Sequence, residues 1–396
     1  MRIATSTYQS QWLTSMQRQQ EEIATTQQQV STGKRIITAA DDPAGAAQSI
    51  LLQQGLDRLD NYAANAETAQ RRLSLEEGSL SQATDTLNRI RELSIQAATG
   101  TQTQESRGAI VAEANQLLTG LLNTANAQDG EGRYLFAGNL VQQRPFVLSG
   151  SVQYVGDSGV RSQAVADART VQEGDPGSAV FMQIPSGNGS FTVASNAANT
   201  GTASWSSATV TGGTPFVSGT YTLQFNGVTN SWDVSDASGP LASIPYTPGG
   251  SVSFQGATIE FQGTPAAGDQ FTVAPARFQD VFKTVQDFIT TLGMDTGSPA
   301  RRATFQNQLN SNLQNLDQAL QQISNTRSQV GARLATIDQE TSSNADVQVE
   351  LKRSLSVIRD VDYATAVSQL QLQLTSLEAA QKTFARTQSL SLFNVL

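Results

Sequence analysis

Both ends of this 396-residue chain carry apolar residues at heptad spacing, and this feature constrains the fold more than any other. Steps of four and three recur at Leu309, Leu313, Leu316, Leu320, Ile323, Val330, Leu334 and Ile337. A later stretch repeats them at Tyr363, Val367, Leu370, Leu374, Leu377 and Phe384, and a sparser N-terminal one at Met16, Ile23 and Val30. Such spacing is typical of a coiled coil. We therefore expect the two ends to pair with each other and the surplus apolar positions to pair with another copy.

Helix signals predict a helical body on both sides of a different middle segment. The first helix is expected over residues 3–30. Asp41 or Asp42 can cap the second helix, because Pro43 follows directly and suits a first helical turn. The remaining helices are expected over about residues 43–100, 110–130, 277–292 and 300–396.

The middle segment, residues 145–276, alternates β-forming and turn residues at short spacing. Candidate strands are residues 152–155, 191–194, 221–225, 232–234, 251–254, 258–261 and 270–273. Asn226-Gly227 predicts a tight turn between two of them. We expect a compact all-β domain whose entry and exit both join the helical body.

The predicted fold class is therefore α+β and multidomain. Long N- and C-terminal helices form a coiled-coil or helical-bundle body, and the all-β domain is inserted into it. We expect three domains: residues 1–40 with 351–396 as a terminal helical assembly domain, residues 41–144 with 277–350 as a helical bundle, and residues 145–276 as the β domain.

Composition excludes several classes of partner. Only 15% of the residues are charged and 38% are hydrophobic, so Gln, Ser, Thr and Asn supply much of the polarity, which favours densely packed polar subunit interfaces. The net charge of -9 argues against nucleic acid or an anionic membrane as a partner, because phosphates bind basic surfaces. No apolar run approaches the ~20 residues of a membrane span. The N-terminal stretch has no apolar core of a cleaved signal peptide, so we expect a cytosolic chain or one exported by another route.

The residue types present also argue against an enzyme. The chain has no Cys and no His, which removes the thiolate nucleophile, the imidazole base and the common metal ligands. Gly33-Lys34 fails as a phosphate loop, since Gln28 and Arg35 replace the required Gly and Ser or Thr. Paired carboxylates could serve a glycosidase, but those of the middle segment lie in turn-like settings: Asp157, Glu173, Asp175, Asp233, Asp236, Glu260 and Asp269. The Asn188-Gly-Ser triplet is expected to be a turn. We predict no catalytic residue, cofactor or metal.

Several motifs resemble those of the flagellin family. Residues 30–45 (VSTGKRIITAADDPAG) and 87–98 (LNRIRELSIQAA) are similar to its N-terminal region. Residues 360–367 (DVDYATAV) and 377–393 (LEAAQKTFARTQSLSLF) are similar to its C-terminal region. Residues 132–138 (GRYLFAG), 152–159 and 263–273 resemble the hook-associated members in particular. The chain is thus identified as a hook-associated member of this family.

This resemblance implies a structural axial protein of the bacterial flagellum, located outside the cell and exported without a cleaved signal peptide. Such a protein would join hook to filament and act as the adaptor on which flagellin polymerises, with its β domain facing outward. The implied partners are further copies of the chain in a helical ring, the first hook-associated protein on the hook side, flagellin on the filament side and a cytosolic export chaperone. Three alternatives stay open: filament flagellin itself, an export-secreted adhesin or enzyme on flagellin-like arms, and a cytosolic coiled-coil scaffold.

The apolar positions of the two ends are the predicted functional residues. A terminal arm cannot bury such a stripe alone, so we expect neighbouring subunits to cover it. The expected assembly interface consists of Met16, Ile23, Val30, Leu355, Ile358, Val367, Leu370, Leu374, Leu377 and Phe384. The expected chaperone-binding face consists of Leu370, Leu374, Leu377 and Phe384.

Overall fold

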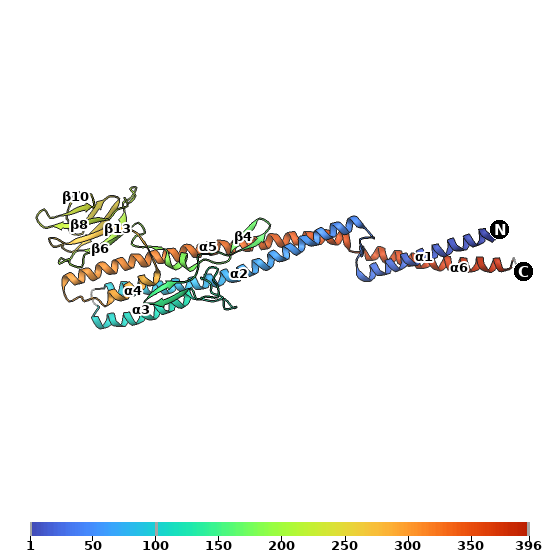
Figure 1. Cartoon of the computed structure of the whole chain (residues 1–396), viewed down its shortest axis with the longest axis horizontal. Coiled ribbons are helices and arrows are strands. Elements are labelled where there is room, and N and C mark those ends of the chain that lie inside the picture. The colour runs from blue at the N-terminus through green and yellow to red at the C-terminus, as the bar shows by residue number, and fades with distance from the viewer. Residues whose placement is uncertain (1, 100–101, 394–396) are drawn as a thin grey trace. The chain divides into compact units, whose positions relative to one another are not determined.

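The computed structural model describes residues 2–99 and 102–393. Its α-helices are α1 (Arg2–Thr32), α2 (Pro43–Ala98), α3 (Gln104–Ala125), α4 (Val281–Leu292), α5 (Pro299–Arg359) and α6 (Tyr363–Phe393), as Figure 1 shows. The chain divides into two compact units, one combining residues up to Ala64 with those from Glu340, the other spanning Asn65–Gln339. The β strands lie in the second unit, between α3 and α4. The predicted fold class, long terminal helices with an inserted β domain, is confirmed.

The helix boundaries follow local capping chemistry. Asp42 is the cap of α2, because its carboxylate accepts the N–H of Gly45 at 2.9 Å. The expectation of one continuous helix from residue 300 to the C-terminus is wrong, since α5 ends at Arg359 and α6 begins at Tyr363. Asp362 accepts the N–H of Ala364 at 3.0 Å and thereby starts α6.

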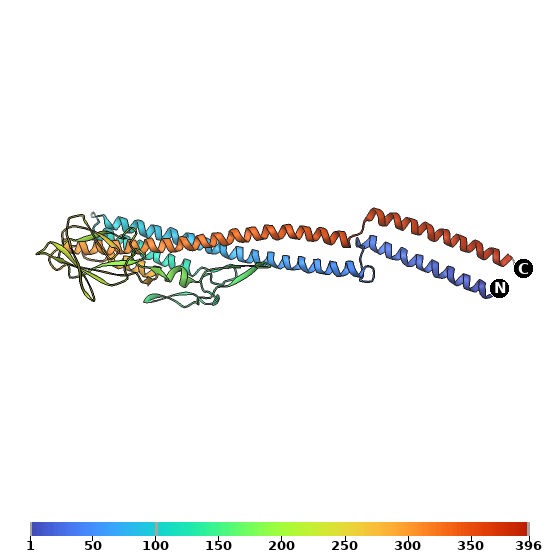
Figure 2. The same ribbon diagram turned by 90° about the horizontal axis from the view of Figure 1, so that it is seen from above.

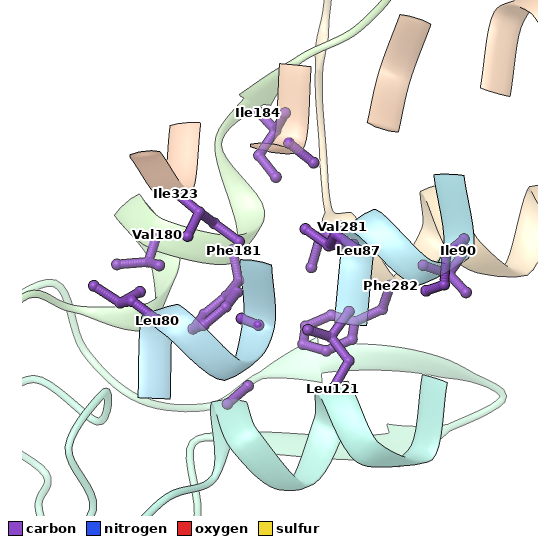
Figure 3. Packing of buried hydrophobic residues seen from close by; sticks show 14 of the residues in the cluster. Leu80, Leu87, Ile90, Leu121, Val180, Phe181, Ile184, Val281, Phe282 and Ile323 are labelled. Atoms are coloured by element: carbon purple, nitrogen blue, oxygen red, sulfur yellow. The ribbon is translucent and has the colours of Figure 1, made fainter. Parts of the chain in front are cut away.

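The second unit has a helical core built on one side of α2. Its buried side chains come from α2, α3, α4 and α5, together with the short π-helix η1 (Ser178–Met182). Figure 3 shows part of this cluster, in which the Leu80, Phe181 and Ile323 side chains point towards one another from three different elements. The aromatic rings of Phe146, Phe181 and Phe282 meet at centroid distances of 5.3–6.1 Å.

Strands β1 (Phe146–Ser149), β2 (Ser151–Tyr154), β3 (Ser162–Ala166) and β4 (Arg169–Gln172) form two separate antiparallel hairpins. Their buried apolar residues, Phe146, Val152, Val165 and Val171, belong to the helical core. Strands β5 (Ile184–Pro185) and β14 (Phe278–Gln279) pair where the chain enters and leaves the remaining β structure. The three-domain division expected from the sequence remains a proposal.

The remaining strands form two antiparallel sheets around a separate core. One sheet has the order β10 (Gly239–Pro245), β9 (Ser231–Asp236), β8 (Tyr221–Asn226), β13 (Gln270–Pro275) and β6 (Phe191–Ser195). The other has the order β11 (Ser251–Phe254), β12 (Ala257–Gln262) and β7 (Ser204–Val210). The Trp232 ring stacks on that of Phe261 at 4.8 Å, so side chains of both sheets share one core.

All seven candidate strands are confirmed within one or two residues, whereas the other seven, β1, β3, β4, β5, β7, β10 and β14, escaped prediction. The Asn226-Gly227 signal does mark a hairpin between β8 and β9. Its loop, however, has four residues, because Asn226 pairs with Ser231. The residue with a left-handed backbone there is Asn230, at φ 50°.

A buried carboxyl group, that of Glu76 on α2, lies beside the 173–175 segment. The side chain is 1% exposed, and Oε1 accepts the Asp175 N–H at 3.1 Å. Oε2 has no hydrogen-bond partner among the described residues. The neighbouring cations are already paired, Arg72 with Asp129 at 3.2 Å and Arg333 with Asp175 at 2.8 Å. Burial, followed by the charge of Asp175, raises the pKa of Glu76 to about 8.

Glu76→Gln should therefore stabilise the protein in alkaline solution. Because the folded-state pKa lies above the ordinary 4.5, the stabilisation from a protonated Glu76 is fully present below about pH 4.5 and is lost as the pH rises through 8. We expect the variant to raise Tm by about 5 °C at pH 9 and to change it little at pH 5, as measured by circular dichroism. The control is Glu77→Gln, which breaks a part-exposed pair with Arg327 and should lower Tm slightly at both pH values. Equal Tm values for wild type and Glu76→Gln at pH 9 would contradict the assignment.

Candidate assembly interface

Helices α1 and α6 pack side by side in the first unit and run antiparallel, with both chain ends at the same end of the pair (Figures 1 and 2). The Gln19 side chain donates to the Ser376 hydroxyl at 3.4 Å, and the Val361 N–H donates to the Gly33 carbonyl at 3.0 Å. The buried or half-buried positions keep heptad spacing on both helices. They are Trp12, Met16, Gln19, Ile23, Thr26 and Val30 on α1, and Ala366, Leu370, Gln373, Leu377, Ala380 and Phe384 on α6. The expected pairing of the two ends is confirmed.

The structure divides the predicted interface residues into two groups. Met16, Ile23, Val30, Leu370, Leu377 and Phe384 lie on the paired faces of α1 and α6, and Ile23 is only 7% exposed. For these residues the partner helix supplies part of the cover, and the expectation that neighbouring subunits supply the rest stays a prediction. Val367 and Leu374 instead lie outside the pair, at 40% and 45% exposed. Leu355 is buried near the end of α5, and Ile358 is half-buried one turn later.

The two connections between helices meet in a joint made of residues 33–42 and 359–362. The Arg35 N–H donates to the Arg359 carbonyl at 2.6 Å, and the Arg35 guanidinium donates to the Ile358 carbonyl at 2.7 Å. Gly33 has φ +70°, and a Cβ there would lie 2.8 Å from the Tyr363 hydroxyl. Glycine is therefore required at this position. The flagellin-like motif of residues 30–45 thus has a structural use, and its Lys34 forms a backbone bridge with Asp360.

The same motif contains a locally stabilised carboxylate. Asp41 accepts the backbone N–H of Thr38 at 2.7 Å and that of Ile37 at 3.0 Å. These hydrogen bonds hold the pKa of Asp41 below its usual value. Ile36, which lies between Arg35 and Ile37 in the chain, is buried. The joint is thus ordered by backbone hydrogen bonds around one apolar side chain.

The first unit leaves much apolar surface uncovered. It holds fewer than a third of the residues but half of the exposed large apolar side chains found in the described ranges, so its surface is unusually apolar. They are Tyr8, Leu13, Ile50, Leu51, Val347, Val349, Val357, Tyr363, Val367, Leu372 and Leu374. Its fully buried apolar side chains are few: Ile23, Ile36, Leu56, Leu355 and Ala366. Contiguous exposed apolar surface marks an interaction site, whereas single exposed apolar side chains are normal. We define this set of exposed residues as the apolar strip.

Six of the seven carboxylates considered for catalysis have partners that give them a structural role. Asp175 pairs with Arg333 and Glu173 with Arg161. Asp157 and Asp236 accept backbone N–H groups in turns, as does Asp269, which accepts those of Thr200 and Ala266. Asp233 accepts from Ser243, and the Glu260 backbone pairs within its sheet. None of these groups is thereby placed opposite another as acid and nucleophile.

One further expectation, that the Asn-Gly-Ser triplet is a turn, is confirmed. Asn188 accepts the N–H groups of Ser190 and Phe191, so the Asn-Gly-Ser triplet is a turn. No described segment is a helix long and apolar enough to cross a membrane, and no described cluster of three or more acidic residues has metal-binding geometry.

Sequence reasoning missed the polar members of the helix pair and the joint. Gln19, Thr26 and Gln373 occupy heptad positions, but an apolar pattern does not include them. The helix break before Asp41 and Asp42 was predicted. For the second half of the joint the signal was the Asp360-Val-Asp362 segment, in which Asp362 is a helix-capping residue.

Comparison with known proteins agrees with this geometry. The model of the bacterial flagellin N-terminal helical region matches residues 3–140, and that of the C-terminal helical region matches residues 313–396. The D2-like domain of flagellar hook-associated protein 1 matches residues 194–275. Flagellar hook-associated protein 3 of Salmonella typhimurium is 33% identical over 186 residues, 47% of this chain and 58% of that protein. The chain thus matches little more than half the length of this curated relative.

Two solved structures match over almost their whole length. FlgL from Xanthomonas campestris has a TM-score of 0.72 and 32% identity, covering 77% of this chain and 99% of that one. The flagellar junction protein FlgL from Legionella pneumophila has a TM-score of 0.73 and 35% identity, covering 79% and 99%.

Ile23→Asp should open the α1–α6 pair. A carboxylate at this buried position has no cation to pair with in the heptad seam, so burying it costs several kcal/mol, on the order of the whole stability of a two-helix contact. We expect the backbone amides of residues 363–386 to exchange at least about tenfold faster, as measured by hydrogen-exchange mass spectrometry on dilute protein. Leu13→Asp, at a half-exposed position of the same helix, is the control and should leave the exchange of α6 unchanged. Unchanged exchange in Ile23→Asp would show that this seam does not hold α6.

Proposed function

The chain belongs to the hook-associated protein 3 (FlgL) family of bacterial flagellar proteins, and from this premise we propose that it joins hook to filament as the adaptor on which flagellin polymerises. One observation carries the proposal: flagellin-type arms are combined here with a β domain of the hook-associated type. We further propose a non-enzymatic protein located outside the cell on the flagellum, exported without a cleaved signal peptide.

The apolar strip supports assembly with other copies. Val367 and Leu374 form a second apolar edge on α6, beside the face that α1 already covers. Covering such side chains contributes about 1.5–3 kcal/mol each, so two per contact give a useful association energy. Each copy presents different surfaces to its two neighbours, and a head-to-tail contact of this kind generates a helical ring or tube.

The two ends of the junction would meet different partners. We propose the first hook-associated protein on the hook side and flagellin on the filament side, because flagellin-type arms carry the same heptad design and so offer compatible apolar edges. The amide-rich, weakly charged surface of the arms adds hydrogen bonds without charge repulsion between like subunits.

Before export, the exposed apolar residues of α6 would favour aggregation in the cytosol. We propose that a small export chaperone covers Leu370, Leu374, Leu377 and Phe384. In the structure Leu370 and Leu377 face α1, so α1 and the chaperone would compete for one side of α6. Chaperone binding therefore requires that the α1–α6 pair has not yet formed.

The nearest alternative is a filament subunit, since the two helical models describe flagellin itself. Immunogold labelling of isolated flagella separates the two. The junction proposal expects one narrow band at the hook end, whereas a filament subunit would be labelled along its whole length. Label at neither place would contradict both.

Two double variants test which side of α6 serves which partner. Val367→Asp with Leu374→Asp places charges in the exposed edge and leaves the α1–α6 seam intact, so it should block attachment of the filament. We expect flagellin to be shed into the medium and motility to be lost, while the helix content of the purified protein stays normal. Leu370→Asp with Leu377→Asp should additionally abolish chaperone binding in a pull-down and reduce helix content.

The control for both is Gln371→Asp, an exposed polar position on the same helix, which should keep filaments and motility. Normal filaments in the Val367→Asp, Leu374→Asp strain would show that this edge is on no subunit interface. Normal chaperone binding of the other variant would remove Leu370 and Leu377 from the chaperone site.

A further inference from the structure

One side chain of α5, that of Asn307, bonds to the edge of a sheet as a neighbouring strand would. Its Oδ1 accepts the Trp205 N–H at 2.9 Å, and its Nδ2 donates to the Ala203 carbonyl at 3.2 Å. Asn307 is 3% exposed. One amide side chain thus pairs with the Trp205 N–H on β7 and with the carbonyl of Ala203, which lies just before β7. A neighbouring strand would pair with these backbone groups in the same way.

The same side of α5 repeats this interaction along the next two turns. Asn310 donates to the Trp205 carbonyl and Gln314 to the Ala208 carbonyl, both on β7. Ser311 donates to the Val193 carbonyl on β6 at 3.1 Å, and Asn315 accepts the Gly187 N–H just before β6 at 2.7 Å. We call these five residues of α5 the amide seat: Asn307, Asn310, Ser311, Gln314 and Asn315.

Both strands in contact with the amide seat are edge strands. β7 ends the three-stranded sheet and β6 ends the five-stranded sheet, so each has one side without a strand neighbour. Unpaired backbone groups on an edge are a liability, because they can pair with another chain. The edge β10 at the far side of the five-stranded sheet is protected differently, by Pro240, Pro245 and a register shift between residues 240 and 242.

The described buried apolar residues of α5 do not extend the core of the two sheets. The core of the two sheets consists of buried residues between Phe191 and Val273, and no buried apolar residue of α5 belongs to it. The buried apolar residues of α5 in this unit, such as Leu309 and Leu316, belong to the helical core instead. The pairing of β5 with β14, where the chain enters and leaves the sheets, also links the two cores.

We propose that α5 acts as a surrogate edge strand for both sheets and that the amide seat fixes the orientation of the β domain on the helical core. Hydrogen bonds to backbone groups are directional, so the six that these five residues make along about two turns of helix define both the position and the rotation of the sheets. The proposal does not depend on a role at the flagellar junction. It makes the β domain a rigid projection from α5.

Spin labels can measure this orientation directly, because the chain contains no Cys. We would introduce Val228→Cys in the β domain and Ser328→Cys on α5, both exposed positions of the second unit, into the full-length protein. Electron-electron resonance should give a narrow distance distribution in this background. The test variant adds Asn307→Ala, Asn310→Ala and Gln314→Ala, which keep helix propensity and remove the bonds to β7. We expect the width of the distribution to grow at least about twofold and the Trp205 amide to exchange at least about tenfold faster.

A matched control removes three exposed amides elsewhere on α5, with Gln308→Ala, Gln321→Ala and Asn325→Ala. It should leave both readouts unchanged. If the test variant loses the sheet core, as reported by the emission of the buried Trp232, the single variant Asn310→Ala takes its place and should broaden the distribution with the core intact. A distribution as narrow as that of the control, with the sheets folded, would overturn the proposal.

Discussion

The burial of heptad apolar side chains between helices is the interaction on which the rest of the structure depends. In the second unit this burial is extensive: Leu73, Leu80 and Leu87 of α2 are fully covered, and Leu320 and Leu334 of α5 are partly covered. In the first unit it is only half complete, because α1 and α6 cover one edge of each other and leave the apolar strip exposed. A single sequence pattern therefore produces a closed core in one place and an unfilled interface in another. The number of packing partners makes the difference, since two helices alone cannot surround a wide apolar face.

Uncharged amide side chains connect different elements of the structure. A chain with so few charged residues cannot rely on ion pairs to orient its parts, and the side chains of Asn307, Asn310 and Gln314 bond to strand backbones instead. Gln19 plays a smaller version of this role between α1 and α6. Amides carry both a donor and an acceptor, so one side chain can satisfy two backbone groups that would otherwise be buried without partners. One cluster of charged residues surrounds Glu76, where four arginines pair with carboxylates.

The candidate interface also explains why the flagellin-type motifs have the sequence they do. Residues 30–45 build a joint that requires a left-handed Gly33 beside Tyr363 and a carboxylate, Asp41, that accepts two consecutive backbone N–H groups. Neither requirement concerns binding of a small molecule. The motif holds the two connections of the joint, residues 33–42 and 359–362, against each other. Helices α1 and α6 therefore leave the joint side by side.

Local patterns in the sequence determined the helices, most strands, the Asp42 cap and the absence of the usual catalytic residue types, because each follows from neighbours within about one turn or one hairpin. The resemblance of short motifs correctly indicated the family. Tertiary structure alone decided which apolar residues of α6 face α1, so that Leu370 is covered and Leu374 is not. It also decided the break at residues 360–362, which depends on a hydrogen bond from Arg35 to Arg359, and the seating of β7 on Asn307. These outcomes join residues that lie one hundred or more positions apart in the chain, and no periodicity within either segment specifies its distant partner.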